Sequence, residues 1–285
     1  MIATPSLTES FATLAGGYDV VLSDVWGVIH NGVAATPAAC DALTRFRSQG
    51  GAVMLITNAP RPGEVVTRFL DKLSVPRSAY DGIVSSGDVT RAVMAERPDK
   101  AVFHIGPPRD LPIFDGLDVT RVDARDAQLI VCTGLFDDET ETPGDYEDLL
   151  RELAARKLTM LCANPDHLVE RGHRLVYCAG ALAQLYAEDG GEVTYAGKPY
   201  APIYELAAEI IAERAGRKVS RSEILAIGDG IHTDMAGAAG FGLDAVFVAS
   251  GLHIGPGGEG LDDLRLAELF EGRKPPRAAM PALAW

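Results

Sequence analysis

The sequence predicts an α/β protein in which a parallel sheet is interrupted by a second α/β unit. Three observations lead to this prediction. Short apolar runs alternate with segments of helical pattern, the alternation starts afresh in the middle of the chain, and the first pattern resumes near residue 193. Such alternation is typical of parallel strands covered by helices. The chain has 285 residues, 47% of them hydrophobic, which is ample for a buried core.

The first part of the chain contains three strand-like runs, each followed by a helical segment. Residues 52–57, Ala-Val-Met-Leu-Ile-Thr, show the continuous apolar character of a buried strand. The helical segment after residue 37 places Leu43 and Phe46 on one face. The predicted strands are 19–23, 52–57 and 83–85, and the predicted helices are 37–49, 62–73 and 88–96.

The middle and last parts of the chain repeat this alternation. In the middle we expect strands 101–105, 128–132 and 158–162 with helices 147–157 and 178–188, the latter ended by Gly190-Gly191. In the last part we expect strands 193–196, 223–227 and 243–248 with helices 199–214 and 233–239. The tail is expected to be irregular. The expected organisation is a discontinuous core of residues 1–86 and 193–285 and an inserted domain of residues 87–192.

Composition limits the partners of the protein. Lys and Arg total 26 and Asp and Glu total 40, a net charge of −14, so we expect neither a nucleic-acid nor a membrane partner. No stretch is long and apolar enough to span a bilayer, and the first fifteen residues lack the pattern of a signal peptide. The four cysteines are scattered and indicate buried free thiols. We therefore expect a cytoplasmic protein.

Polar motifs follow four of the predicted strands. Ligands of open parallel sheets bind beyond the carboxyl ends of the strands, so these positions are candidate site residues. Each motif alone is also typical of a turn, a helix cap or an exposed lysine. The motifs are Asp24-Val25-Trp26-Gly27-Val28, Thr57-Asn58, Gly197-Lys198-Pro199, and Gly228-Asp229-Gly230-Ile231-His232-Thr233-Asp234.

Taken together and in this order, the motifs resemble those of the haloacid dehalogenase superfamily. The insertion falls between the second and third motifs, where the C2 caps of that superfamily sit. Asn164-Pro165-Asp166 resembles a motif of class IIA caps, the NagD-like and nitrophenyl phosphatase-like group. The resemblance implies a Rossmann-like parallel-sheet core with a large inserted α/β cap of the C2 type, and suggests a homodimer formed through the cap.

The resemblance also implies an activity. It implies a phosphomonoester hydrolase that depends on Mg²⁺ and acts on a small phosphorylated metabolite, with Asp24 as the nucleophile that forms an aspartyl-phosphate. Lys198 would be a second catalytic residue, and Thr57 and Asn58 would hold the phosphoryl oxygens with it. Asp166 would be a substrate residue of the cap.

The same resemblance implies the ligands of the metal. Mg²⁺ would be bound by the carboxylate of Asp24, the backbone carbonyl of Trp26 and the carboxylate of Asp229. Asp234 would support the metal from behind these ligands.

Trp26 departs from the family pattern. Phosphatases of this superfamily carry a second Asp two residues after the nucleophile, as the acid and base for the leaving group and the water. An indole cannot do this, and losing such a group costs about 10²–10⁴ in rate. Three explanations stay open: a substrate with a good leaving group, a proton from His30 or Asp166, or binding with very slow turnover. A loop histidine without a role is the alternative for His30.

Three functions follow from these features. A phosphomonoesterase is favoured, because a chain freed from catalysis has no physical need to keep Asp24, Lys198, Asp229 and Asp234 together. The alternatives are a weakened scaffold that binds a phosphorylated ligand, which Trp26 supports, and a phosphotransferase.

Overall fold

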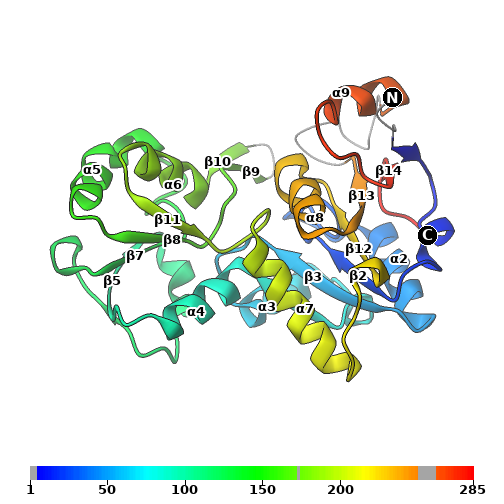
Figure 1. Cartoon of the computed structure of the whole chain (residues 1–285), viewed down its shortest axis with the longest axis horizontal. Helices are drawn as coiled ribbons and strands as arrows, with labels where there is room; N and C mark the ends of the chain where they lie inside the picture. The colour runs from blue at the N-terminus through cyan, green and yellow to red at the C-terminus, as the bar shows by residue number, and fades with distance from the viewer. Residues whose placement is uncertain (1–4, 172–173, 250–260) are drawn as a thin grey trace. The chain divides into compact units, whose positions relative to one another are not determined.

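The computed structural model describes residues 5–171, 174–249 and 261–285. The chain divides into two compact units (Figure 1). The first unit consists of Met1–Thr57, Thr67–Val84 and Tyr204–Trp285, and the second of Asn58–Val66 and Ser85–Ile203. In the described part of the chain, no helix is both long and apolar enough to cross a membrane.

The first unit is built around a seven-stranded sheet in the order β1-β14-β13-β12-β2-β3-β4. Each neighbouring pair from β1 to β3 in this order is parallel. The central strands are buried along their whole length, as expected for strands covered on both faces. The strands are β1 (Ser6–Leu7), β2 (Val20–Ser23), β3 (Ala52–Thr57), β4 (Gly82–Ser85), β12 (Ile224–Gly228), β13 (Asp244–Val248) and β14 (Ala278–Met280).

Helices of this unit follow the strands along the chain. Helix α2 (Pro37–Ser48) begins with proline at its first position and buries Leu43 and Phe46, as predicted. Between β12 and β13, a turn of π-helix (Ile231–Met235) leads into α8 (Ala236–Phe241). The others are α1 (Ala12–Ala15), α9 (Asp263–Leu269), and two helices that begin in the second unit and end in the first, α3 (Gly63–Lys72) and α7 (Ala201–Ala215).

The second unit contains its own parallel sheet of five strands, in the order β11-β8-β7-β5-β6. An antiparallel hairpin, β9 and β10, forms a separate two-stranded sheet. The strands are β5 (Ala101–Ile105), β6 (Thr120–Arg121), β7 (Leu129–Cys132), β8 (Thr159–Cys162), β9 (Leu168–Arg171), β10 (Arg174–Tyr177) and β11 (Glu192–Tyr195).

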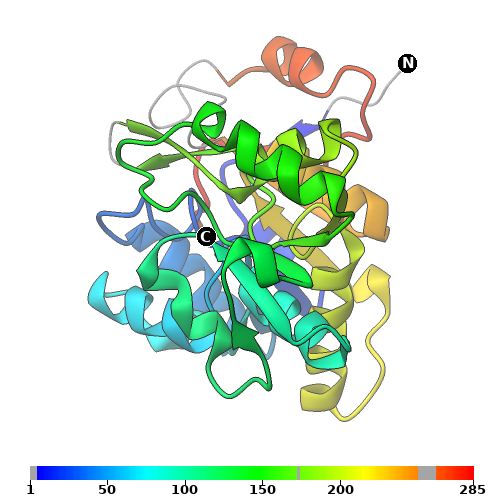
Figure 2. The same cartoon turned by 90° about the vertical axis from the view of Figure 1, so that its left-hand side faces the viewer.

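Helices cover both faces of this second sheet. Side chains alternate between the faces along β7: Ile130 packs in one core with α5 (Glu147–Ala155) and α6 (Ala179–Glu188), and Leu129 in another with α4 (Ser86–Glu96). Helices α5 and α6, green in Figures 1 and 2, share one face of the sheet. The predicted α/β class with an inserted α/β unit is therefore confirmed.

Two local predictions were wrong. The strand predicted at 193–196 in the core is β11, which pairs with β8 in the second unit, and the chain returns to the first unit only at Tyr204. The tail is not irregular throughout, since β14 pairs with β13 and β1. In both cases the strand is identified by its partner in space and not by its own short sequence.

Candidate active site

Asp24 lies at the carboxyl end of β2, in the middle of the larger sheet. Its backbone N–H donates to the carbonyl of Ile227 on the neighbouring strand at 2.8 Å. The hydroxyl of Ser23 donates to the carbonyl of Asp24 at 2.9 Å. Asp24 is only 6% exposed. The sheet therefore fixes the position of this residue. Its burial keeps most water away from the carboxylate.

Two further carboxylates lie beside Asp24. Carboxylate oxygens of Asp24, Asp229 and Asp234 lie within 4.8 Å of one another. Asp229 directly follows β12, which pairs with β2, so the two strands end at the same edge. Asp234 comes from the following π-helical turn, and its Oδ2 accepts from the N–H of Gly230 at 3.1 Å. All three carboxylates are thus part of one cluster.

Two glycines make the close approach possible. Gly27 has a φ of +88°, and a Cβ there would lie 2.0 Å from Oδ2 of Asp229. A Cβ on Gly228 would lie 2.2 Å from the carboxyl carbon of Asp234. Any side chain at either position would push a carboxylate out of place.

The carboxylate cluster fits a hard divalent cation. Three carboxylates at this separation repel one another, and a cation between them offsets that repulsion. Hard oxygen donors suit Mg²⁺, which needs few protein ligands because it keeps several waters. The donor set of Asp24, Asp229 and Asp234 is therefore compatible with the predicted metal.

The indole of Trp26 packs within its own loop. Its ring contacts the ring of His30 at a centroid distance of 5.1 Å and an angle of 73°. It also covers Gly32, where a Cβ would lie 2.4 Å from the indole. The N–H of Gly27 donates to the carbonyl of His30 at 2.8 Å and closes the loop. Trp26 thus shapes the loop beside Asp24.

His30 is a buried packing residue. It is 2% exposed, and its ring lies between Trp26 and Phe69. Nδ1 accepts from the N–H of Gly32 at 2.9 Å, so the ring proton of the neutral form is on Nε2. Desolvation lowers the pKa of His30 to about 4. At neutral pH the ring is uncharged and has no acidic proton to give, which favours the reading without a role in proton transfer.

The second and third motifs are anchored in different ways. Thr57 ends β3 in the first unit and is 6% exposed. Asn58 and Lys198 lie in the second unit, 5% and 2% exposed. The N–H of Lys198 donates to Oδ1 of Asn58 at 2.7 Å, and Nδ2 of Asn58 donates to the carbonyl of Lys198 at 3.1 Å and to Oδ1 of Asp166 at 2.9 Å. The structure thus gathers Asn58, Asp166 and Lys198 together.

This geometry changes the expectation for Asn58. An amide side chain has two donor hydrogens, and both are used by Lys198 and Asp166. The side chain of Asn58 is therefore not arranged to donate to a phosphate oxygen. The sequence could not reveal this, because its partners are 108 and 140 residues away.

The loop that carries Asp166 is itself held in place. Oδ1 of Asn164 accepts from the N–H of Asp166 at 3.1 Å, and the N–H of Gly180 donates to the carbonyl of Asp166 at 3.1 Å. A Cβ on Gly180 would lie 2.2 Å from the carbonyl oxygen of Pro165. Gly180 was not among the predicted site residues; a glycine inside a predicted helix is the signal that could have identified it.

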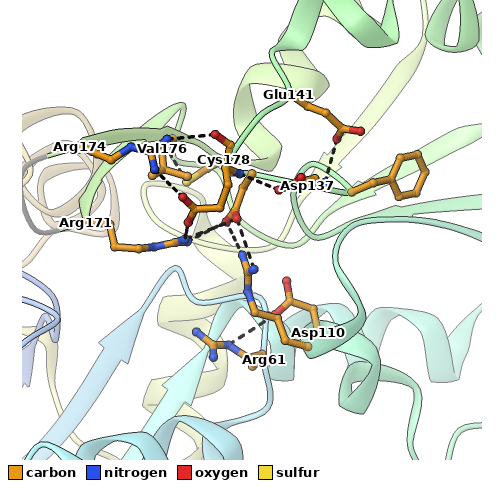
Figure 3. Close-up of polar contacts among 12 residues, drawn as sticks. Arg61, Asp110, Asp137, Glu141, Arg171, Arg174, Val176 and Cys178 are labelled. Carbon is orange, nitrogen blue, oxygen red and sulfur yellow. Dashed lines mark hydrogen bonds and ion pairs between the residues drawn. The ribbon is translucent and has the colours of Figure 1, made fainter.

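A charged network in the second unit ties the β9–β10 hairpin to the loop after β7 (Figure 3). Asp138 accepts from both Arg109 and Arg171. Burial alone would raise the pKa of Asp138, but the hydrogen bonds from the two arginines outweigh it and lower that pKa. Nearby, Nε of Arg61 lies 3.5 Å from Oδ1 of Asp110. Because its charges are paired, the network serves the structure of this unit.

Comparison with known proteins agrees with the fold. Residues 21–120 match the family described as haloacid dehalogenase-like hydrolase, and residues 195–257 match a related HAD-like hydrolase family. A solved hydrolase of the haloacid dehalogenase-like family from Brucella suis 1330 is 46% identical, with 97% of this chain and 100% of that chain covered and a TM-score of 0.88. The protein belongs to the haloacid dehalogenase-like family of hydrolases.

Two more distant proteins are also similar. A 4-nitrophenylphosphatase from Thermotoga maritima is 20% identical, with 94% of this chain and 95% of that chain covered and a TM-score of 0.68. An acid sugar phosphatase from Staphylococcus haemolyticus is 22% identical over 243 residues, 82% of this chain and 86% of that protein. The structure of this chain has the fold that the class IIA resemblance implied, a Rossmann-like core with an inserted cap.

Proposed function

We propose that the protein is a phosphatase that depends on Mg²⁺, hydrolyses a phosphomonoester of a small metabolite and uses Asp24 as its nucleophile. The observation that carries the proposal is the cluster of Asp24, Asp229 and Asp234 within 4.8 Å at the carboxyl ends of β2 and β12. The names of its relatives, a nitrophenylphosphatase and an acid sugar phosphatase, support the same reaction class.

In this proposal the chain's own residues divide the work. The carboxylate of Asp24 attacks phosphorus, the ester oxygen leaves with its electron pair, and an aspartyl-phosphate forms. Water then attacks that phosphorus and loses a proton to solvent, the bond between phosphorus and the carboxylate oxygen of Asp24 breaks, and phosphate is released. Thr57 and Lys198 hold the phosphoryl oxygens. Asp24, Asp229 and the carbonyl of Trp26 would hold Mg²⁺, with Asp234 behind these ligands, and the bound ion would neutralise part of the phosphoryl charge.

Release of p-nitrophenol from p-nitrophenyl phosphate tests the proposal. We expect turnover with Mg²⁺, none with EDTA, and a fall of about 10³-fold or more in Asp24→Asn, because an amide is not a nucleophile here. Asp148→Asn is the matched control, since Asp148 is fully exposed on α5 and is expected to leave the rate unchanged.

Three other outcomes point elsewhere. Equal rates in wild type and Asp24→Asn would exclude Asp24 as the nucleophile. Absence of turnover would favour the alternative function, a scaffold that binds a phosphorylated ligand. Phosphorylated alcohol formed in the presence of alcohol acceptors would identify a phosphotransferase. The cytoplasmic location and the homodimer through the cap stay predictions.

A further inference from the structure

The side-chain amide of Asn58 is held by partners that fix its orientation. The N–H of Lys198 can only donate, so Oδ1 must face it at 2.7 Å. A carboxylate oxygen of Asp166 accepts from Nδ2 at 2.9 Å. These two partners select one of the two amide orientations, and in that orientation Nδ2 also reaches the carbonyl of Lys198 at 3.1 Å.

The main chain of Lys198 is therefore held by hydrogen bonds at both its N–H and its carbonyl. Its N–H and its carbonyl both bond to one side chain, much as two strands pair. The atoms around these two hydrogen bonds are closely packed. A Cβ on Gly197 would lie 2.4 Å from Oδ1 of Asn58 and 2.8 Å from the hydroxyl of Ser86. Lys198 is 2% exposed, so its backbone has little room to shift.

Asp166, in the inserted segment, holds the side chain of Asn58 in this orientation. Its N–H and its carbonyl are bound by Asn164 and Gly180, so its carboxylate is presented to Asn58 by a fixed loop. An unbroken line of hydrogen bonds thus runs from the loop after β8 through Asn58 to Lys198.

We propose that Asp166 and Asn58 are positioning residues that hold Lys198 for the phosphoryl group, with Asp166 acting through Asn58. This assignment rests on the proposed function, in which Lys198 binds phosphoryl oxygens. It replaces the expected roles of Asn58 as a phosphate ligand and of Asp166 as a proton donor or substrate contact.

A leaving-group series separates positioning from proton transfer. Across aryl phosphates whose phenols differ in pKa, Asp166→Ala is expected to lower kcat/KM by the same factor, about 10–100-fold, because misplacing a phosphate-binding group costs this much. The inhibition constant for inorganic phosphate is expected to rise as well. A loss that grows with the pKa of the leaving phenol would instead identify Asp166 as a general acid and overturn the proposal.

Conservative and double variants test whether Asp166 acts through Asn58. Asp166→Asn keeps an acceptor oxygen for Nδ2 and is expected to stay within about threefold of wild type. Asn58→Asp keeps the acceptor for Lys198 but loses both donors, so it is expected to be at least as impaired as Asp166→Ala. In an Asn58→Ala background, Asp166→Ala is expected to have no further effect. Additive losses in the double variant would contradict the proposal.

A readout without turnover keeps this inference separate from the proposed function. In wild type, the side-chain amide hydrogens of Asn58 are expected to exchange slowly with solvent by NMR, and in Asp166→Ala to exchange at least about tenfold faster. Asp148→Ala is the control. Unchanged exchange in Asp166→Ala would refute the positioning role even if no aryl phosphate is hydrolysed. Faster exchange without turnover would support the hydrogen bond from Asn58 to Asp166 and would contradict only the phosphatase assignment.

Discussion

The indole of Trp26 occupies the loop position where the family resemblance places a general acid. It packs on His30 and Gly32, and His30 is itself neutral and buried. Neither side chain can protonate a departing alkoxide. If the protein hydrolyses phosphomonoesters as proposed, we therefore expect it to prefer substrates whose leaving group departs as a stable anion.

The rate should consequently depend steeply on the leaving group. We expect kcat/KM of the wild type to fall sharply as the pKa of the leaving phenol rises, because no proton is supplied at Trp26. Trp26→Asp is expected to flatten this dependence and to raise the rate on alkyl phosphates by about tenfold or more. Steady-state kinetics on an aryl and alkyl phosphate series measures both effects.

Trp26→Phe is the matched control, since it loses part of the packing but gains no acid. Its dependence on the leaving group is expected to stay as steep as that of the wild type. A shallow dependence in the wild type would show that another residue supplies the proton.

Two buried histidines are expected to lower the stability of the protein in mild acid. Desolvation lowers the pKa of both His30 and His104 from 6.5 to about 4. Between those values the unfolded chain binds protons that the folded chain does not. Their contribution to stability is therefore complete above pH 6.5, and the free energy of unfolding falls as the pH drops towards 4, by about 1.4 kcal/mol per pH unit for each histidine.

Substitutions that keep the hydrogen bonds test this. In His30→Asn the amide oxygen can accept from Gly32 in place of Nδ1, and in His104→Gln the amide can meet the hydroxyl of Thr133. Urea unfolding between pH 7 and 4.5 is expected to show a shallower acid limb in each. The exposed His167→Gln should match wild type. An acid limb that is equally steep in all variants would rule out this cause.

At the scale of residues, the sequence was sufficient to predict where the carboxylates lie but not which role the amide of Asn58 has. Asp24 and Asp229 follow apolar strands, and parallel strands bring such residues to one edge. Asn58 follows a strand too, but its role depends on a carboxylate and a peptide far along the chain. An amide can serve as donor or acceptor, so its residue type alone leaves the partner open.

At the scale of elements, the first turn of helix α6 holds the loop that carries Pro165 and Asp166. Gly180 lies in its first turn, against the carbonyl of Pro165. Alanine is normally the better helix former, by about 1 kcal/mol. Here its methyl group would meet backbone that cannot rotate away.

Gly180→Ala is accordingly expected to destabilise the protein by about 1–3 kcal/mol in urea unfolding, the usual cost of overpacking. Gly144→Ala is the control, because a Cβ there would meet its nearest neighbour only at 3.7 Å. That variant is expected to stay within about 0.5 kcal/mol of wild type. Equal stability of the two variants would mean that the loop yields to the methyl group.

Strands were harder to assign to a sheet than to detect. The run at β11 was found, yet its pairing with β8 joins Val193 to Met160 in the second unit. Strand β14, only three residues long, gains its identity from β13 and β1 on either side. Hydrophobic pattern predicts that a strand exists, but hydrogen-bonded partners decide where it lies.

At the scale of the whole molecule, the inserted organisation was visible and its boundary was not. The repeated strand and helix alternation indicated a second α/β unit, and the structure has one. The return to the first unit was placed at residue 193, and it occurs at Tyr204, within α7. A helix that starts in one unit and ends in the other has no compositional break to mark the change.

The larger sheet is assembled from both ends of the chain, since β2 pairs with β12 and Val20 faces Ile224. During synthesis on a ribosome, β2 and β3 emerge long before β12 exists, whereas β5, β6, β7, β8 and β11 all emerge between them. The inserted sheet can therefore complete its pairing on the nascent chain first. Until residue 228 has left the exit tunnel, one edge of β2 has no native partner. We therefore expect a chaperone to bind the nascent chain at this strand.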